Sequence, residues 1–229
     1  QICEIGDASK GSLSSYAYVL MLLHYLQQCS PPVIPVLQEL YNPKEDKPEQ
    51  LVEGWNVWFY EDLRALPKVW PEFGKNRQGI GELWLGLFKY YSEFPIKDNV
   101  INIRQKRPLT RFEKLWNGEC LAVEDPFDLN HNLGGGLSKK MNNYILRALI
   151  NARELYGVPF DTVPHLIEKY ITPADYFFDP LLLTEGRPPN DRGCRECGKI
   201  GHIAKKCPQH LKNLQRKKER YGMNKAHCV

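Results

Sequence analysis

The sequence predicts a predominantly helical α+β fold with a small strand pair, followed by a short metal-binding unit. Three long stretches repeat apolar residues with the 3.6-residue period of a helix. Two shorter stretches show the alternation or the apolar run that is typical of strands. Three cysteines and a histidine then lie within 14 residues near the C-terminal end. With 229 residues, 42% of them hydrophobic and 25% charged, the chain has the composition of a globular protein with one sizeable core.

The three predicted helices span Leu13–Gln28, Glu82–Glu93 and Lys139–Tyr156. The first has Ser12 as its expected N-cap, and the two prolines that follow the helix end it. The third follows a run of three glycines and has Ser138 as its expected N-cap. Each of these helices has an apolar face that must be buried, so we expect the three to share a core.

The two predicted strands are Asn99–Arg104, where side chains alternate in character, and Leu121–Val123, which is apolar and ends before Pro126. A further short helix is expected near Val163–Tyr170. The remaining long segments are irregular, polar or rich in proline and glycine, and they are predicted as loops and linkers: Asn42–Gln50, Trp55–Trp70, Gln105–Arg111 and Gly186–Gly193.

The composition changes near Asn190, which predicts a body over residues 1–190, a metal-binding unit over 191–210 and a basic tail over 211–229. The net charge of +4 conceals an asymmetry, because Arg192–Val229 holds 11 Lys and Arg against 2 acidic residues, a net of +9. This basic end predicts a polyanionic partner.

No apolar run approaches the roughly 20 residues that cross a bilayer. The first 14 residues have neither the charged start nor the apolar stretch of a signal peptide, so we expect no membrane segment and no leader. The seven cysteines are scattered apart from the C-terminal cluster, which indicates a reducing compartment such as the cytoplasm rather than a disulfide framework.

The C-terminal cluster has the spacing Cys-x2-Cys-x4-His-x4-Cys and consists of Cys194, Cys197, His202 and Cys207. Three thiolates and one imidazole fill the tetrahedral shell of Zn²⁺, so the expected site is structural and has no open position for catalysis. Because about 15 residues cannot form a core of their own, zinc binding and folding of this unit should be one event.

Zinc knuckles of this size commonly bind single-stranded nucleic acid through basic and exposed apolar side chains. A zinc unit that binds another protein is the alternative. The side chains that we expect to contact RNA are Arg195, Lys199, Ile200, Ile203, Lys205 and Lys206.

Two segments of the body carry a resemblance to a known family. The segment GSLSSYAYVLMLL (Gly11–Leu23) resembles a helix in the central domain of template-independent RNA nucleotidyltransferases. The segment EDPFDLNHNLG (Glu124–Gly134) resembles the nucleotide-recognition loop of their poly(A)-polymerase-associated (PAP-associated) region. With the zinc knuckle that follows, the chain up to Pro208 is similar to the zinc-knuckle terminal uridylyltransferases. The resemblance implies a nucleotidyltransferase central and PAP-associated domain followed by a CCHC zinc knuckle.

The resemblance also implies roles for four side chains in binding UTP. Ser15 would contact a triphosphate oxygen near the positive end of the helix, and Tyr16 would stack on uracil. His131 would donate to uracil O4, while Asp125 would help to accept the N3–H group. Adenine presents a donor where uracil has O4, and an unpaired polar group costs about 1–3 kcal/mol, so the pattern implies a preference for UTP.

The catalytic carboxylates of the family are missing from these residues. An Asp-x-Asp pair on a strand is expected about ten residues after a Gly-Ser turn, but Met21–Tyr25 contains no acid. We therefore expect no catalytic residue in this segment. The catalytic Mg²⁺ or Mn²⁺ and the triphosphate lysines would belong to an N-terminal catalytic palm of the same enzyme.

The leading hypothesis is thus the UTP-selecting and RNA-binding half of an RNA terminal uridylyltransferase, which adds uridines to RNA 3′ ends. Its implied partners are a single-stranded, oligouridine RNA 3′ end, with microRNA precursors and messenger tails as substrates, and RNA-binding proteins. Two alternatives stay open: a non-canonical poly(A) polymerase, which His131 disfavours, and a non-catalytic RNA-binding adaptor with a degenerate transferase fold.

Overall fold

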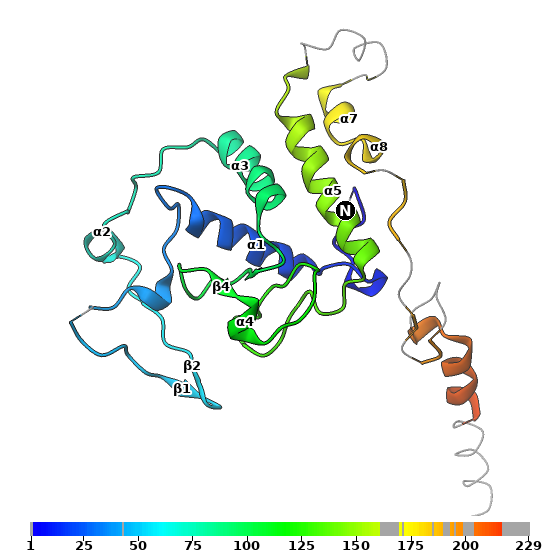
Figure 1. Cartoon of the computed structure of the whole chain (residues 1–229), viewed down its shortest axis with the longest axis horizontal. Helices are drawn as coiled ribbons and strands as arrows, with labels where there is room; N and C mark the ends of the chain where they lie inside the picture. The colour runs from blue at the N-terminus through cyan, green and yellow to red at the C-terminus, as the bar shows by residue number, and fades with distance from the viewer. Residues whose placement is uncertain are drawn as a thin grey trace, which may run out of the picture.

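Three helices form the frame of the body in the structure, which is a computed structural model. They are α1 (Ser15–Gln28), α3 (Ile80–Glu93) and α5 (Lys139–Tyr156). Figure 1 shows α3 and α5 on one side of α1, with the short strands and the loops between them on the other. The structure describes these residues: 2–42, 44–160, 170, 172–184, 186–189, 193–194, 196–198 and 204–216.

Helix α1 begins at Ser15 because Ser14, and not Ser12, is its N-cap. The Ser14 hydroxyl oxygen accepts a hydrogen bond from the backbone N–H of Ala17 at 3.2 Å. The expected cap Ser12 instead donates its hydroxyl hydrogen to the carbonyl of Ile5. The prediction was wrong by two residues because both serines precede the same apolar pattern, and only the backbone conformation decides which hydroxyl reaches the helix.

The other two long helices confirm their predicted positions closely. Helix α3 begins at Ile80, and its start is closed by Glu82, whose carboxylate accepts from the N–H of Gly79 at 2.7 Å. Helix α5 begins after Ser138, whose hydroxyl oxygen accepts from Met141 N–H at 3.1 Å. A side chain cap at the expected serine therefore fixes the start of α5.

The strands are shorter than predicted and pair differently. Strand β3 (Asn99–Val100) pairs antiparallel with β4 (Leu109–Thr110), which lies in the segment expected to be a basic loop. The predicted strand at residues 121–123 joins only through a single parallel bridge between Ile101 and Val123. Hydrogen bonds on both sides of this bridge nevertheless place residues 121–124 firmly beside β3.

A second strand pair lies in a region that the sequence predicted to be irregular. Strand β1 (Leu51–Val52) pairs antiparallel with β2 (Trp55–Asn56). The sequence did not reveal it because two-residue strands are too short to show alternation. The short helices, including 3-10 turns, are Ala8–Lys10, Leu37–Glu39, α2 (Leu66–Val69), α4 (Arg111–Lys114), α7 (Pro173–Phe177), α8 (Pro180–Leu183), Ala204–Lys206 and residues 208–216.

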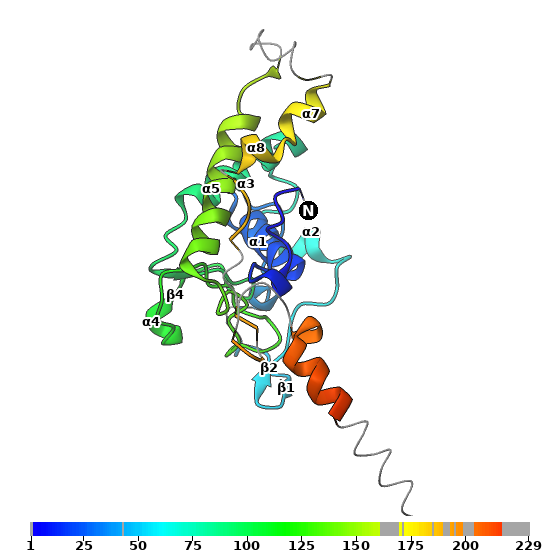
Figure 2. The same ribbon diagram turned by 90° about the vertical axis from the view of Figure 1, so that its right-hand side faces the viewer.

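The core lies where the three long helices meet the strand residues. Tyr91 of α3 is fully buried and donates its hydroxyl hydrogen to the carbonyl of Met21 in α1 at 2.6 Å. Helices α7 and α8 lie along α5 in both views (Figures 1 and 2), where Asn151 donates to the carbonyl of Leu183 at 3.2 Å. The central buried side chains are Leu13, Ala17, Leu20, Met21, Phe88, Tyr91, Ile101, Leu121, Val123, Met141, Ile145 and Leu149.

Two expectations fall on residues that are not described. The expected helix near 163–170 lies outside the described residues except for Tyr170, which is not helical. The expected domain boundary near Asn190 also lies outside them. Across the residues that the structure does describe, none of the helices has the length and apolarity needed to cross a membrane.

Candidate functional site

The N-terminal turn of α1 and the loop over residues 124–132 meet at one site. Tyr16 is the second residue of α1, and its side chain remains 39% exposed. Its hydroxyl donates to Oδ1 of Asp125 at 3.2 Å, although the two residues are 109 positions apart. The fold therefore brings together the two segments that were singled out separately in the sequence.

The loop is closed by backbone pairing, which places Asp125 opposite His131. Asp125 N–H donates to the carbonyl of His131 at 3.1 Å, and Glu124 and Asn132 form an antiparallel bridge. The side chains face each other as well, with Nδ1 of His131 at 3.4 Å from Oδ2 of Asp125. Whether this contact is a hydrogen bond depends on which imidazole nitrogen carries the proton, because a neutral imidazole has one donor and one acceptor nitrogen.

Asp125 is held by three partners. Its Oδ1 atom accepts from Tyr16 and from the backbone N–H of Phe127 at 3.1 Å, while Oδ2 faces the imidazole. Partial burial raises the pKa of the Tyr16 hydroxyl, and the charge and hydrogen bond of Asp125 raise it further. Tyr16 therefore stays a neutral donor, and the carboxylate is fixed between a ring and an imidazole.

Asn132 and Gly134 shape the C-terminal end of the loop. The Asn132 side-chain oxygen accepts from Val123 N–H at 3.1 Å and from Gly134 N–H at 2.9 Å. A Cβ atom at Gly134 would lie 2.0 Å from the carbonyl oxygen of Leu121. The first glycine of the run is thus required by close packing on the backbone of Leu121.

Ser15, the remaining expected nucleotide contact, is exposed as the first residue of α1. The positive end of the helix dipole favours an anion at this position. Gly6 packs beside it, since a Cβ at Gly6 would lie 3.7 Å from the Ser15 hydroxyl oxygen. All four expected nucleotide-binding residues therefore lie on α1 or on the loop that contacts it.

A buried ion pair lies under the loop and was not expected from the sequence. Lys114, the last residue of α4, places Nζ at 2.8 Å from Oε1 of Glu124. The two side chains are only 14% and 7% exposed. The same ammonium donates to the carbonyl of Leu129 and lies 4.9 Å from the ring centre of Trp116.

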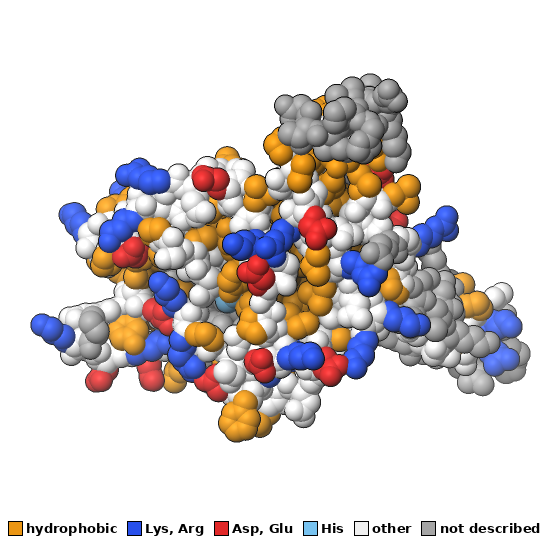
Figure 3. Space-filling view, turned by 45° about the horizontal axis from the view of Figure 1, so that its top comes forward, with side chains coloured by type: hydrophobic (Ala, Val, Ile, Leu, Met, Phe, Trp, Pro, Cys, Tyr) orange, Lys and Arg blue, Asp and Glu red, His pale blue; other side chains and the backbone are white. Residues whose placement is uncertain are grey.

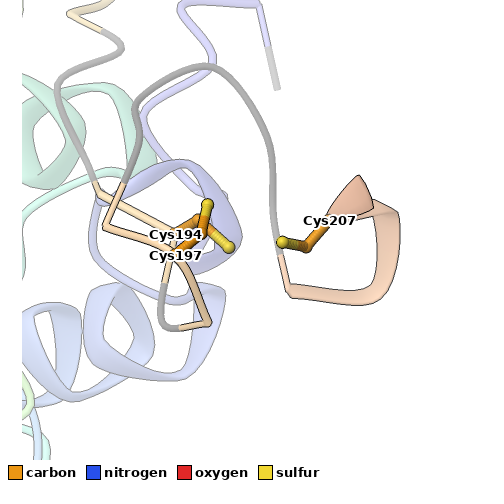
Figure 4. A group of neighbouring side chains, drawn as sticks. All are labelled: Cys194, Cys197 and Cys207. Carbon is orange, nitrogen blue, oxygen red and sulfur yellow. The ribbon is translucent and has the colours of Figure 1, made fainter. Parts of the chain in front are cut away.

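The three cysteines of the expected zinc unit converge. The sulfur atoms of Cys194, Cys197 and Cys207 all lie within 4.8 Å of one another, and Figure 4 shows Cys207 facing the other two. Gly198 makes the turn between them with φ +71° and donates its N–H to the carbonyl of Cys194 at 2.7 Å. Zinc–sulfur bonds of about 2.3 Å place thiolates about 4 Å apart, so this triad fits Zn²⁺.

The surroundings of the Cys194 thiol favour its charged thiolate form. Burial acts to raise its pKa, but hydrogen bonds from the backbone N–H groups of Glu196 and Cys197 and from the neighbouring thiols lower the pKa overall. A thiolate is the form that binds metal.

Part of the expected zinc and RNA surface falls on residues that are not described. Lys205 is exposed in the turn Ala204–Lys206, and the side chain of Lys206 is not described. Lys and Arg side chains are visible on the C-terminal extension in Figure 3. The expected residues outside the described ranges are Arg195, Lys199, Ile200, His202 and Ile203.

Comparison with known proteins finds relatives of both parts of the chain. Residues 79–131, which run from the N-cap of α3 to His131, match the family described as Cid1 family poly A polymerase. Residues 192–209 match the zinc knuckle family. The sequence is 52% identical over 229 residues to Terminal uridylyltransferase 7 of Homo sapiens, and the match covers 99% of this chain and 15% of that protein. Poly(A) RNA polymerase GLD2 of Rattus norvegicus is 39% identical over 127 residues, with 55% of this chain and 25% of that protein covered.

Solved structures of Cid1 have the same fold. Cid1 in complex with the UTP analog UMPNPP has a TM-score of 0.62 and 33% identity, and the match covers 77% of this chain and 51% of that chain. Cid1 in complex with its short product ApU has a TM-score of 0.60 and 33% identity, with 69% and 50% covered. The chain thus spans about half of Cid1 and about 15% of the uridylyltransferase.

These observations define a nucleotidyltransferase segment, a PAP-associated region followed by a zinc knuckle. Over nearly its whole length the chain is homologous to one segment of the terminal uridylyltransferases.

Proposed function

We propose that this chain is the UTP-selecting and RNA-binding part of an RNA terminal uridylyltransferase that adds uridines to RNA 3′ ends. The observation that carries the proposal is the convergence of Tyr16, Asp125 and His131 from two distant segments. The match to uridylyltransferases over nearly the whole chain supports it.

Base selection follows from the hydrogen-bond pattern of uracil. The exposed ring of Tyr16 stacks on the base, which stabilises any base by about 1–3 kcal/mol. An imidazole N–H of His131 donates to O4, and Asp125 accepts the N3–H group directly or through water. Adenine offers an amino donor in place of O4, so His131 is left unpaired. A missing hydrogen bond of this kind gives roughly tenfold to 200-fold discrimination against ATP.

The chemistry of the transfer belongs to residues outside this segment. Glu124 is paired with Lys114, while Asp125 accepts from Tyr16 and Phe127 and faces His131, so the two carboxylates do not form an open pair of ligands for a catalytic cation. Within the described residues, the only cluster suited to a metal is the cysteine triad. Mg²⁺ or Mn²⁺ on a catalytic palm would activate the RNA 3′ hydroxyl and neutralise the triphosphate. Ser15 contributes a triphosphate contact from the start of α1.

RNA is held by the zinc unit and the basic residues around it. His202 completes the zinc site with the three cysteines, and the site is structural. The exposed side chains of Lys205, Lys212 and Arg216 supply positive charge after the knuckle. The RNA-binding set of the proposal is Arg195, Lys199, Ile200, Ile203, Lys205 and Lys206. The proposed RNAs are microRNA precursors and messenger tails in the cytoplasm, which would connect the enzyme to RNA-mediated gene silencing.

The proposal is tested by His131→Ala and His131→Asn in the complete enzyme. We expect the kcat/KM ratio of UTP over ATP to fall at least tenfold, because the group that distinguishes O4 from an amino group is lost or altered. Asn130→Ala, at the adjacent exposed position, is the matched control and should leave the ratio unchanged. An unaltered ratio in both His131 variants would show that another group selects the base.

Poly(A) addition is the second candidate, and the similarity to GLD2 favours it. The same assay decides between the two functions, since an adenylyltransferase would prefer ATP before any substitution. If the complete protein binds RNA but extends it with neither UTP nor ATP, this chain is instead part of a non-catalytic RNA-binding adaptor.

A further inference from the structure

We propose that Lys114 is a positioning residue for UTP selectivity, because its ammonium group holds the loop that presents Asp125 and His131. This inference rests on the proposed function of the loop. Lys114 does not itself reach the base in the proposal. It acts through Glu124, which directly precedes Asp125, and through Leu129, two residues before His131.

The contacts of Lys114 join the two arms of the loop. Nζ lies 2.8 Å from the Glu124 carboxylate at the start of the loop, and it also donates to the carbonyl of Leu129, two residues before His131. The ring of Trp116, 4.9 Å away, adds a cation–π contact. One ammonium group therefore binds the residue before Asp125 and a backbone group near His131, and it limits how far the two arms can separate.

The burial of this pair makes the constraint strong. Exposed ion pairs contribute little because water screens them. Here the carboxylate of Glu124 is 7% exposed, so removal of Lys114 leaves a charge without a cation in a poorly solvated place. We expect the carboxylate then to move toward water, and this movement of Glu124 displaces the neighbouring Asp125.

Arg111 lies on the same helix as Lys114 but has a different role, which is to attach α4 to the body. Arg111 is buried and donates through Nε to the carbonyl of Ile96 at 2.8 Å and through its other nitrogen to that of Cys120. Thr110 caps the same helix. The guanidinium of Arg111 thus fixes α4 to the body, whereas the ammonium of Lys114 is directed to the loop.

The test compares Lys114→Met with Lys139→Met in the complete enzyme. Methionine keeps an unbranched side chain, one heavy atom shorter than that of lysine, and removes the charge. We expect Lys114→Met to lower the UTP-over-ATP ratio of kcat/KM at least tenfold through a raised KM for UTP, with kcat/KM for ATP within twofold of the parent. Lys139→Met is the control, because Lys139 forms an ion pair with Glu119 in which the two side chains are 75% and 55% exposed. It should change neither the UTP-over-ATP ratio nor the KM for UTP.

The conservative variant and a His131 control complete the design. Lys114→Arg keeps a cation and should retain the ratio within about threefold. If His131→Ala relaxes selectivity while Lys114→Met leaves it intact, Lys114 has no positioning role; if neither relaxes it, the proposed function of the loop fails instead. Equal losses with UTP and ATP indicate a purely structural role and overturn the proposal.

A second variant covers the case in which Lys114→Met does not fold. Glu124→Gln keeps the shape and an acceptor but removes the charge that Lys114 binds. We expect a folded protein with a UTP-over-ATP ratio reduced at least threefold. A folded Glu124→Gln enzyme with full UTP selectivity would contradict the inference.

Discussion

At the scale of single residues, the hydroxyl of Tyr16 does more than complete a stacking ring. It donates to the same carboxylate that faces His131, so the residue proposed to stack on the base and the residues proposed to select it are in direct contact. Tyr16→Phe keeps the ring and removes the hydrogen bond, which is worth about 0.5–1.5 kcal/mol. We therefore expect the UTP-over-ATP ratio to fall about threefold to tenfold, while the affinity for either nucleotide changes less.

Steady-state kinetics with both nucleotides measure this effect, and Tyr16→Ala gives the contrast. The alanine variant loses the ring as well and should weaken UTP and ATP alike, since stacking is tolerant of the base. Tyr41→Phe, whose ring lies against Trp58 away from the loop, is the matched control. A Tyr16→Phe enzyme with the parent's ratio would mean that the hydroxyl does not orient Asp125 for base selection.

The two histidines described in the body show why residue type alone does not define a site. His24 is buried between the carbonyl of Asn102 at 2.6 Å and the hydroxyl of Tyr90 at 3.0 Å, and burial lowers its pKa. It is a core residue of α1 whose two ring nitrogens both have a polar partner. His131 is an exposed residue in a polar loop, and only its position opposite Asp125 distinguishes it from a solvated turn residue.

At the scale of elements, the sequence predicted the long helices, in which the apolar period repeats several times. Helices α3 and α5 were found because 14 and 18 residues sample the helical period several times. The two-residue strands β1, β2 and β4 cannot show a period, and their pairing depends on contacts made by the rest of the fold. The two segments that carry the four expected nucleotide-site residues could be singled out from the sequence, and the structure brings them together. The contacts of Lys114 could not be predicted, because they depend on distance in space.

The next prediction concerns the hydrogen bond between helix α5 and the backbone of Leu121. The side-chain oxygen of Asn142 is buried and accepts from Leu121 N–H at 2.8 Å. Asn142→Leu keeps a similar volume but leaves this buried N–H unpaired, which costs about 1–3 kcal/mol. We expect a lower free energy of unfolding by that amount in a denaturant titration. Asn143→Leu, at the next and exposed position, should change it by less than about 0.5 kcal/mol.

If Asn142→Leu were as stable as the parent protein, the backbone at Leu121 would not depend on α5. The loop at 124–132 follows this segment directly, so the same variant connects packing to the site. A loss of stability without any change in the UTP-over-ATP ratio would show that the loop is held locally, by contacts such as those of Lys114 and Asn132.

At the scale of the whole molecule, the proposed base-selecting and RNA-binding groups lie on different parts of the chain. The proposed base-selecting groups lie on α1 and the loop that contacts it, while the excess of positive charge lies from Arg192 onward. A knuckle that depends on zinc to fold can therefore be removed while the three-helix core keeps its own contacts. We therefore expect loss of the knuckle to change zinc content and RNA affinity together and to leave the preference for UTP unchanged.

The double variant Cys194→Ser/Cys197→Ser tests that separation in the complete enzyme. It removes two thiolates of the triad, so the knuckle should lose its zinc and its fold. We expect zinc content to fall by one ion for each chain and the affinity for oligouridine to weaken at least tenfold, with a smaller dependence of binding on salt. The UTP-over-ATP ratio should stay within twofold, because the loop at 124–132 keeps its contacts. Cys120→Ser, outside the triad, controls for loss of a thiol. Zinc loss with unchanged oligouridine affinity would remove RNA from the role of the knuckle and leave protein binding as its function.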